Sequence, residues 1–261
     1  MENREQLTAI ILAAGEGTRL RPYTLDRPKC LVEIEGVSLL DRQLAVLAKE
    51  SVSNVVLIGG YRAEMLNRQG IDLRINPRYA ATNMVSTLFC AEEDLNGDVL
   101  VCYGDIVYSR YVLSKVLNSS YDIAVAIDLD WEAYWRARNE DPLEDAETLK
   151  LGSNGRILEI GQMPKTIDEI EGQYMGLIKF SSTGIQSLKE VFSHASTLGN
   201  LRGKAIEKAY MTDLLQAMID LGYMLNSVPV HGGWIEVDTV SDLVSEITRS
   251  RLTQIQIELR D

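Results

Sequence analysis

Continuous apolar runs alternate along the first half of the chain with segments in which apolar residues recur at helical spacing. The runs are rich in Val and Ile, which is typical of strands buried on both faces of a sheet. We expect such strands at Thr8–Leu12, Asn54–Ile58, Asp98–Tyr103 and Ile123–Ile127. Helical spacing predicts helices over Leu39–Lys49, with Ser38 as the N-cap, and over Val112–Leu117. This alternation predicts an α/β fold with a mostly parallel sheet and helices on both faces.

The pattern changes between residues 128 and 175. Residues 128–147 are strongly charged and include Trp131, Tyr134 and Trp135. Two short strands, joined by a turn at 153–155, are expected at Thr148–Leu151 and Arg156–Ile160. The remaining pattern predicts a strand at Gly176–Phe180, a helix at Thr212–Ile219, a strand at Leu225–Val230 and a helical segment at Val240–Leu259. We therefore expect one Rossmann-like domain over residues 1–261, with residues 128–175 forming a small inserted lobe.

Composition narrows the class of protein. The chain has 261 residues, 46% of them hydrophobic, and a formal net charge of -12. So acidic a chain, without a basic run, is not expected to bind nucleic acid by counterion release. No apolar stretch is long enough to span a membrane, and the polar start of the chain does not resemble a signal peptide. Cys30, Cys90 and Cys102 lack metal-ligand spacing and are odd in number, which favours reduced thiols and a cytoplasmic location.

The first predicted strand runs into a loop of small residues and then into two cations. The loop begins with Leu12, Ala13, Ala14, Gly15, Glu16, Gly17, Thr18 and Arg19, and Lys29 follows shortly after. Glycines let backbone N–H groups approach phosphate oxygens, and the cations can neutralise the remaining charge. Leu20 replaces the third glycine of a dinucleotide-binding motif, and Thr18-Arg19 does not match a P-loop. From spacing alone, an ordinary βα turn is an equally good interpretation.

Two acids follow other predicted strands. Gly104-Asp105 ends one apolar strand, and Asp238 follows the apolar segment that contains Glu236. Carboxylates at the carboxyl ends of strands can hold Mg²⁺ beside a phosphate, although turn-capping and N-capping roles explain them as well. His194 and His231 are the only histidines, and neither lies in a recognisable nucleophilic arrangement.

The loop motif, continued through Pro28, Lys29 and Leu31, resembles the signature of the nucleotidyltransferases, and the chain is similar to their bacterial phosphocholine cytidylyltransferase branch. The segment from Asn76 to Leu88, which contains Asn83 and Ser86, resembles a motif of that branch. The resemblance implies transfer of CMP from CTP to a phosphorylated small molecule, with Mg²⁺ as cofactor and release of pyrophosphate. It implies metal ligands at Asp105 and Asp238, and catalytic roles for Lys29, Arg19 and Asp105. It implies nucleotide contacts from the loop residues 12–19, Lys29, Asn83, Ser86 and Gly104.

The acceptor is left open by the sequence. Residues 128–175 are interpreted as part of an acceptor lobe, with Trp131, Trp135, Glu171 and Tyr174 as candidate contacts. A choline group would need an aromatic cage, but the helical spacing of the two tryptophans favours packing between lobes. A hexose-1-phosphate enzyme using another nucleotide and a non-catalytic nucleotide-binding module are the alternatives. The helical segment at the end of the chain is expected to pack on its own domain or on a second subunit of a homo-oligomer.

Overall fold

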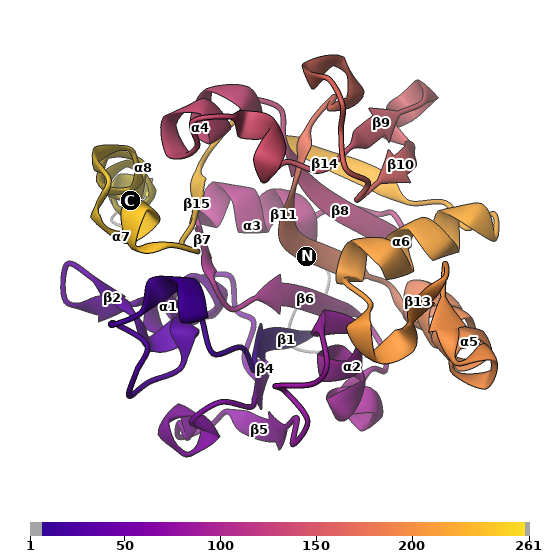
Figure 1. The fold of residues 1–261 in the computed structure, drawn as a ribbon. Coiled ribbons are helices and arrows are strands. Elements are labelled where there is room, and N and C mark those ends of the chain that lie inside the picture. Colours follow the sequence, from indigo (N-terminus) through magenta and orange to yellow (C-terminus); the bar gives the residue numbers. More distant parts are fainter. Residues whose placement is uncertain (1–6, 259–261) are drawn as a thin grey trace.

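The computed structural model describes residues 7–258, with side chains up to residue 256. Its centre is a seven-stranded sheet in the order β14-β8-β11-β6-β1-β4-β5 (Figure 1). The bounds are β1 Thr8–Ala13, β4 Asn54–Gly59, β5 Asp72–Ile75, β6 Val99–Tyr103, β8 Ile123–Asp128, β11 Gln173–Phe180 and β14 Asn226–Val230. Neighbouring strands are parallel except that β11 runs antiparallel to both β6 and β8. The predicted mostly parallel α/β sheet is confirmed.

Helices cover both faces of this sheet, as the continuous apolar strands predicted. Ala9 and Ile11 of β1 belong to one core cluster with residues of α1 (Leu39–Lys49) and α3 (Arg110–Leu117). Ile10 and Leu12 belong to a second cluster with residues of α2 (Met84–Leu88), α5 (Ser182–Leu198) and α6 (Met211–Asp220). Because side chains alternate along a strand, β1 supplies both cores and is buried throughout.

A smaller apolar cluster joins the end of the chain to the loops that follow β1. It contains Leu20, Val32, Ile235 and Leu252. Its residues come from the loop after β1, from β2 (Glu33–Ile34), which pairs with β3 (Val37–Ser38), and from α1, β7 (Ile106–Tyr108), β15 (Trp234–Glu236), α7 (Val240–Val244) and α8 (Glu246–Glu258). Since β15 pairs antiparallel with β7, this cluster brings the C-terminal segment beside the end of β6. The C-terminal helix therefore packs on its own chain.

Residues 128–175 extend the sheet region on the side of β8 and β14. They form α4 (Trp131–Arg138) and the antiparallel pair β9 (Leu149–Leu151) and β10 (Ile157–Ile160). The predicted turn is confirmed, with Asn154 and Gly155 in the left-handed region. The N–H of Ile157 donates to the carbonyl of Leu225, so the pair is anchored beside β14. A second small pair, β12 (Asn200–Leu201) and β13 (Lys204–Ala205), follows α5.

Most expected elements are confirmed within a few residues, and Ser38 caps α1 by accepting from the N–H of Asp41. The long helix α5 was not predicted. The helical segment expected at 240–259 is two helices within the described residues, because Ser245 is extended and its hydroxyl accepts from the N–H of Thr248 to start α8. Thr239 rather than Asp238 is the N-cap of α7, which leaves the Asp238 carboxylate available for other contacts. Within residues 7–258, no helix combines the length and apolar character needed to cross a membrane.

Candidate active site

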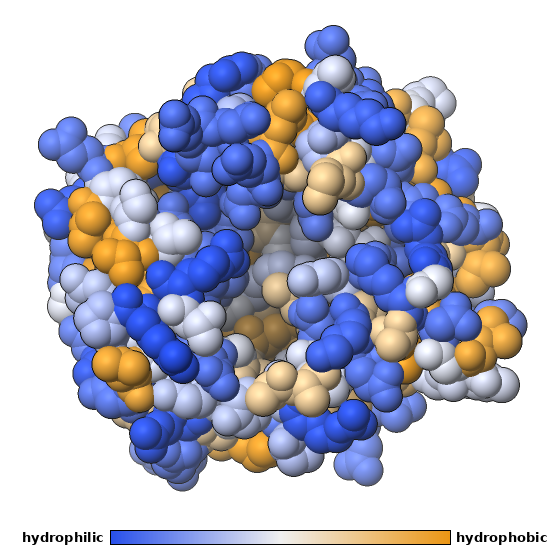
Figure 2. Space-filling view, viewed as in Figure 1, coloured by the Kyte–Doolittle hydropathy of each residue, from blue (hydrophilic) through white to orange (hydrophobic). Residues whose placement is uncertain are grey.

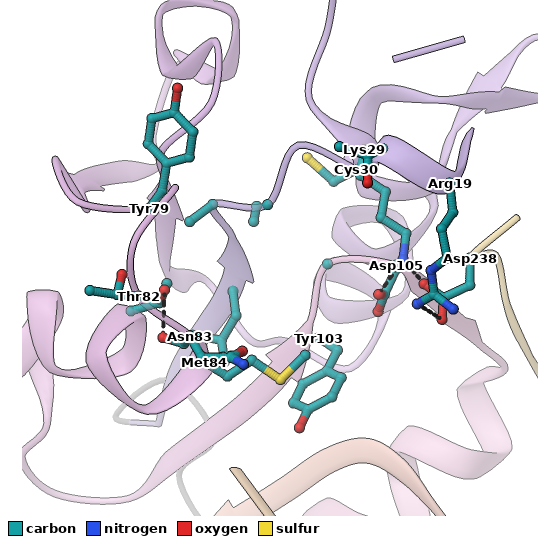
Figure 3. A pocket seen from close by; sticks show the side chains of 18 residues that line it. Arg19, Lys29, Cys30, Tyr79, Thr82, Asn83, Met84, Tyr103, Asp105 and Asp238 are labelled. Atoms are coloured by element: carbon teal, nitrogen blue, oxygen red, sulfur yellow. Dashed lines mark hydrogen bonds and ion pairs between the residues drawn. The ribbon is translucent and has the colours of Figure 1, made fainter. Parts of the chain in front are cut away.

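A cavity of about 310 Å³ lies at the carboxyl ends of β1 and β6. Figure 2 shows the hollow in this face of the molecule, and Figure 3 shows its wall. Many predicted nucleotide contacts line it: Leu12, Ala13, Ala14, Gly15, Gly17, Thr18, Arg19, Lys29, Asn83 and Gly104. Glu16 does not line this cavity; its carboxylate instead accepts from Arg21. Ser86 lies on α2 and is also absent from the wall of the cavity.

The glycine loop is shaped around Lys29. Gly17 has φ +63, and its carbonyl accepts from the Thr24 hydroxyl at 2.8 Å. A Cβ built on Gly17 would lie 2.9 Å from the Cβ of Lys29, closer than real contacts allow. Glycine is required here both for the left-handed backbone and for the close passage of Lys29. The small residues therefore let the cation reach the cavity alongside the loop.

A second glycine brings the end of β6 against the end of β1. The N–H of Gly104 donates to the carbonyl of Leu12 at 3.0 Å, and a Cβ on Gly104 would lie 2.6 Å from that carbonyl oxygen. The next residue, Asp105, lines the cavity with its side chain 15% exposed. Backbone contact between the two strand ends thus fixes where this carboxylate lies.

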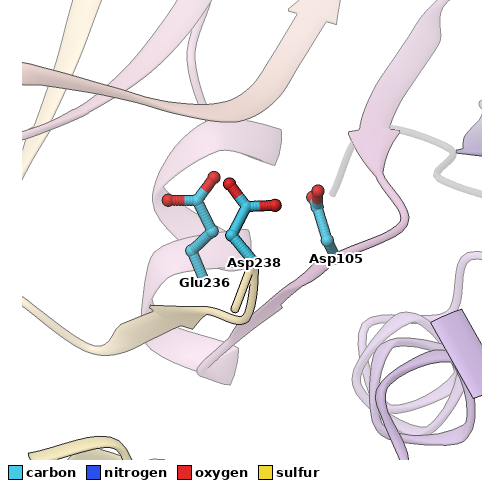
Figure 4. A group of neighbouring side chains, drawn as sticks. All are labelled: Asp105, Glu236 and Asp238. Carbon is cyan, nitrogen blue, oxygen red and sulfur yellow. The ribbon is translucent and has the colours of Figure 1, made fainter. Parts of the chain in front are cut away.

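Asp238 reaches the same place from the other end of the chain. In the β7–β15 ladder Glu236 pairs with Ile106, and the N–H of Val237 donates to the carbonyl of Asp105 at 3.0 Å. One carboxylate oxygen from each of Asp105, Glu236 and Asp238 lies within 4.8 Å of the other two (Figure 4). The convergence that the sequence could only suggest is therefore present, with Glu236 as a third member.

Two cations neutralise this cluster. The Nζ of Lys29 donates to Asp105 Oδ2 at 2.6 Å and also to Asp238 Oδ1, and Arg19 donates to Asp238 Oδ2 at 2.8 Å (Figure 3). Burial alone would lower the pKa of Lys29, but the charges of Asp105 and Asp238 outweigh it and raise that pKa. Burial would likewise raise the pKa of Asp238, yet the Lys29 ammonium keeps it below its ordinary value. Lys29 and Asp238 are therefore both charged at neutral pH.

Glu236 has its own cation, which the sequence did not reveal as a partner. Arg138 of α4 donates to Glu236 Oε2 at 2.9 Å and to Asp242 Oδ1 at 2.9 Å. Asp242 in turn accepts from the N–H of Asp238 at 3.0 Å. Burial and the nearby Asp238 charge raise the pKa of Glu236 to about 8, although Arg138 opposes that rise. Arg138 therefore holds the segment that carries both Glu236 and Asp238.

The carboxylate cluster suits a divalent cation. Among the described residues, the buried Oδ1 of Asp105 has no hydrogen-bond partner, which leaves a carboxylate oxygen directed at no protein donor. Mg²⁺ takes hard oxygen ligands, commonly from one or two carboxylates completed by water and phosphate. Asp105 and Asp238 therefore fit the predicted ligand set, and Glu236 lies within reach of the same ion.

The opposite wall of the cavity comes from the segment before α2. Asn83 caps α2 by accepting from the N–H of Met84, and the buried Asn76 donates to the hydroxyls of Thr82 and Thr87. Asn83 is thus the N-cap of α2, and it lines the cavity as well. Further lining residues were not singled out from the sequence: Cys30, Tyr79, Thr82, Met84, Thr87 and Tyr103. Four of them, Tyr79, Thr82, Met84 and Thr87, fall within the predicted segment 76–88, so their place in the sequence could have identified them.

The structure corrects the predicted acceptor role of two tryptophans. Trp131 and Trp135 are 4% and 2% exposed and do not line the cavity. Their rings lie edge to face with each other, and Trp135 also packs on Trp234 and on the guanidinium of Arg138. The packing alternative is therefore the correct interpretation, because no ring face remains open for a ligand.

The other two predicted acceptor residues lie apart from each other. Tyr174 is buried on β11 with its ring edge to face with Tyr103, which lines the cavity. Glu171 is exposed, and its carboxylate accepts from the N–H of Leu151 on β9. Only Tyr174 is thus linked to the cavity through a neighbour.

Comparison with known proteins agrees with this geometry. A family model described as a MobA-like NTP transferase domain matches residues 9–159. The chain is 38% identical over 257 residues to the CTP:phosphoglutamine cytidylyltransferase of Campylobacter jejuni, covering 93% of this chain and 100% of that relative.

Two solved structures share the fold. The inositol-1-phosphate CTP transferase from T. maritima matches with a TM-score of 0.73 and 22% identity over 95% of this chain and 96% of its own. The CTP:phosphocholine cytidylyltransferase from Streptococcus pneumoniae matches with a TM-score of 0.68 and 19% identity over 96% of this chain and 99% of its own. The predicted resemblance is confirmed, and the chain belongs to the MobA-like NTP transferase family as a nucleotidyltransferase.

Proposed function

We propose that this nucleotidyltransferase moves CMP from CTP to a phosphorylated small molecule and releases pyrophosphate, with phosphoglutamine as the first acceptor to test. The observation that carries the proposal is the convergence of Asp105, Asp238 and Lys29 at one cavity next to the glycine loop. The choice of CTP and of phosphoglutamine follows the relative that is 38% identical along its whole length. The three cysteines within the described residues are unpaired thiols, which supports a reducing, cytoplasmic setting.

Asp105 and Asp238 would hold Mg²⁺, with Glu236 beside them. When bound, this ion supplies positive charge to phosphate oxygens and so favours both attack and departure of anionic groups. Lys29 and Arg19 form ion pairs with these carboxylates at the cavity, so both side chains would also contact the phosphates of a triphosphate bound there. The backbone of residues 14–18 borders the cavity and offers N–H donors to phosphate oxygens.

The reaction needs no nucleophile from the protein. A phosphate oxygen of the acceptor forms a bond to the α-phosphorus of CTP, and the bond from that phosphorus to the bridging oxygen breaks as pyrophosphate leaves. The transition state spreads negative charge over the phosphoryl oxygens, so preorganised cations and N–H groups stabilise it more than the ground state. Lys29 is suited to this role because its neighbours keep it protonated, with a pKa above the ordinary value despite burial.

One assay separates the candidate activities. The purified protein is incubated with Mg²⁺, each of the four nucleoside triphosphates and each of three acceptors: phosphoglutamine, phosphocholine and glucose 1-phosphate. Pyrophosphate release is followed and the nucleotide product is identified by mass. We expect release with CTP and phosphoglutamine. Release only with glucose 1-phosphate would assign the hexose-1-phosphate alternative, and no release with any pair, despite measurable CTP binding, would assign a non-catalytic module.

A further inference from the structure

The turn between β6 and β7, which carries Asp105, is held by α1 through a buried side chain. Gln43 of α1 is fully buried, and its Nε2 donates to the carbonyls of Tyr103 at 2.9 Å and Ile106 at 2.8 Å. These two carbonyls lie on either side of Gly104-Asp105 in the chain. Both N–H groups of one amide are therefore used to close this turn.

The two carbonyls also explain why a polar residue occupies this buried position. A carbonyl oxygen accepts and cannot donate, so the amide must direct its NH2 group, and not its Oε1, at Tyr103 and Ile106. The Oε1 of Gln43 is buried and has no hydrogen-bond partner within residues 7–256. An unpaired buried acceptor lowers stability, so packing of α1 alone would favour an apolar side chain here. The glutamine is thus explained by the turn that it holds.

The strand partners of the turn leave the carbonyl of Ile106 to α1. The N–H of Gly104 donates to the carbonyl of Leu12 on β1, and the carbonyl of Asp105 accepts from the N–H of Val237. Because hydrogen-bonded positions alternate along an antiparallel pair, the neighbouring Ile106 directs its carbonyl away from β15. The turn is therefore anchored by β1, by the C-terminal segment and by α1.

Contacts of the Asp105 side chain alone do not fix where its carboxylate lies. Its Oδ2 accepts from Lys29 at 2.6 Å, and Lys29 would also contact a triphosphate. Its Oδ1 is buried without a hydrogen-bond partner among the described residues. Metal binding requires ligand distances that are correct to within about 0.2 Å. The backbone of the turn therefore determines whether Asp105 meets Glu236 and Asp238 at one ion.

We propose that Gln43 is a positioning residue of the active site, which sets the turn so that Asp105 can bind the metal ion together with Asp238. The proposal rests on the proposed function, because it assumes that Asp105 holds the Mg²⁺ of that reaction. Gln43 does not line the cavity, so it acts through Asp105 and not on a substrate. Removing a group that orients a metal ligand changes metal affinity by about 10- to 100-fold.

The test measures metal binding as well as activity. Mn²⁺ takes the same oxygen ligands as Mg²⁺. Protein is titrated into Mn²⁺ and CTP, and water-proton relaxation reports the Mn²⁺ that the protein holds. Gln43→Met nearly keeps the length of the side chain and removes both donors, and we expect it to weaken this binding by about 10- to 100-fold. The Mg²⁺ concentration for half-maximal pyrophosphate release should rise in parallel.

Gln216→Met is the matched control. Gln216 is another buried glutamine, 5% exposed, whose Oε1 accepts from the N–H of Ile160 at 2.7 Å, and neither residue lines the cavity. Both substitutions should lower the urea midpoint of unfolding, but only Gln43→Met should weaken the binding of Mn²⁺ and CTP. An equal loss of binding in the two variants would make the role of Gln43 merely structural. If Gln43→Met does not fold, Gln43→Asn replaces it, because its amide ends one carbon short of the two carbonyls.

A double-mutant cycle tests whether Gln43 acts through Asp105. In the Asp105→Asn background, Gln43→Met should change the binding of Mn²⁺ and CTP by less than about twofold, because the carboxylate that Gln43 positions is gone. A loss as large as in wild type would overturn the proposal, since Gln43 would then act elsewhere.

The outcomes separate this proposal from the proposed function. If Gln43→Met binds Mn²⁺ and CTP as wild type does, and wild type transfers CMP, the positioning role is wrong and the proposed function stands. If wild type holds Mn²⁺ with CTP but transfers CMP to no acceptor, the proposed function is wrong, and the binding measurements still support or overturn the positioning role. If wild type holds no Mn²⁺ in the presence of CTP, Asp105 is not a metal ligand and the positioning role fails.

Discussion

Lys29 and Arg138 each join two carboxylates, but in opposite settings. Lys29 contacts Asp105 and Asp238 at the wall of the cavity, with its side chain 15% exposed. Arg138 contacts Glu236 and Asp242 with its side chain 2% exposed, beneath the aromatic rings of α4. The first pair of contacts can be exchanged for a ligand, whereas the guanidinium and Asp242 of the second are closed to solvent, and only Glu236 reaches the carboxylate cluster. A cation and its carboxylates at the wall of a cavity can bind a ligand, whereas the same groups inside the protein hold neighbouring segments in position.

The two regions also differ in how their residues come together. The glycine loop and its cations are close in sequence, and backbone contacts between β1 and β6 place them. Residues 128–175 place their charges and rings against the C-terminal segment, as Arg138 does with Asp242. A dense set of aromatic and charged residues is therefore no sign of a binding site unless something leaves it open.

The largest effect is expected from removing Arg138, the cation of the buried pair. Arg138→Met leaves the buried Asp242 carboxylate, whose pKa Arg138 holds below the ordinary value against burial, without its partner, and an unpaired buried charge costs about 3–5 kcal/mol. We expect the free energy of unfolding, measured by urea titration, to fall by that amount. The variant should also need more Mg²⁺ for half-maximal activity, since Asp242 no longer holds the backbone of Asp238 in place.

Arg136→Met is the control on the same helix. Within residues 7–256, Arg136 has an ion pair with Glu132 alone, and the two side chains are 55% and 45% exposed, so its loss should change stability by less than about 0.5 kcal/mol. Equal effects of the two substitutions would contradict the distinction between the two regions. Arg138→Lys should restore part of the stability but not the two-sided contact of the guanidinium.

Removing a carboxylate of the open pair should instead affect chemistry. Asp105→Asn keeps the shape of the side chain but weakens the cluster that would hold Mg²⁺, and we expect kcat/KM to fall by about 10²–10³. Stability should change little, because Lys29 keeps Asp238 as a partner. Pyrophosphate release and thermal unfolding measure the two effects, with the exposed Asp26→Asn as control. Retained pyrophosphate release would show that the metal assignment is wrong.

The difference between these regions explains what the sequence could predict. The loop from Leu12 to Lys29 was identified because its function depends on backbone shape and on cations that are neighbours in the chain. The placement of Asp105 at a strand end followed from the apolar run before it. Its meeting with Glu236 and Asp238 depends on the pairing of β7 with β15, which no local pattern contains.

The misses have different causes. The helical spacing of Trp131 and Trp135 favoured packing, but the partner Trp234 belongs to a distant strand, so spacing did not identify what covers Trp135. The missed helix α5 did carry a local signal, with Ser181 as N-cap and Gly199 as a left-handed C-cap. Both ends of that helix could therefore have been predicted from the sequence, and its apolar residues recur at helical spacing.

A smaller effect is expected from a substitution that tests whether the rings of α4 only stabilise the fold. Trp135→Phe removes part of a buried ring while keeping an aromatic group, and we expect about 1–2 kcal/mol of destabilisation by urea titration. KM for the acceptor should stay within about twofold of wild type, since the ring does not line the cavity. A large rise in KM without loss of stability would return Trp135 to the acceptor site.

The smallest expected effect concerns the pH dependence of stability at Glu147. Burial raises the pKa of Glu147 to about 7; Thr212 and Lys204 lower it, whereas Asp213 and Asp145 raise it. The folded protein therefore binds this proton more tightly than the unfolded chain, whose carboxyl keeps its ordinary pKa of 4.5. The stabilising effect of the proton is fully present below about pH 4.5 and is lost as the pH rises towards 7.

Glu147→Gln removes this titration, because glutamine resembles the protonated carboxyl at every pH. Relative to wild type, the variant should gain about 1–2 kcal/mol of stability between pH 5 and pH 8, a value reduced by the partial exposure of the side chain. Urea titrations of both proteins at the two pH values measure the gain, and Glu144→Gln, at an exposed acid of the same loop, should show none. If the difference in unfolding free energy between the two proteins is instead the same at both pH values, Glu147 does not titrate between them, and burial does not raise its pKa as described.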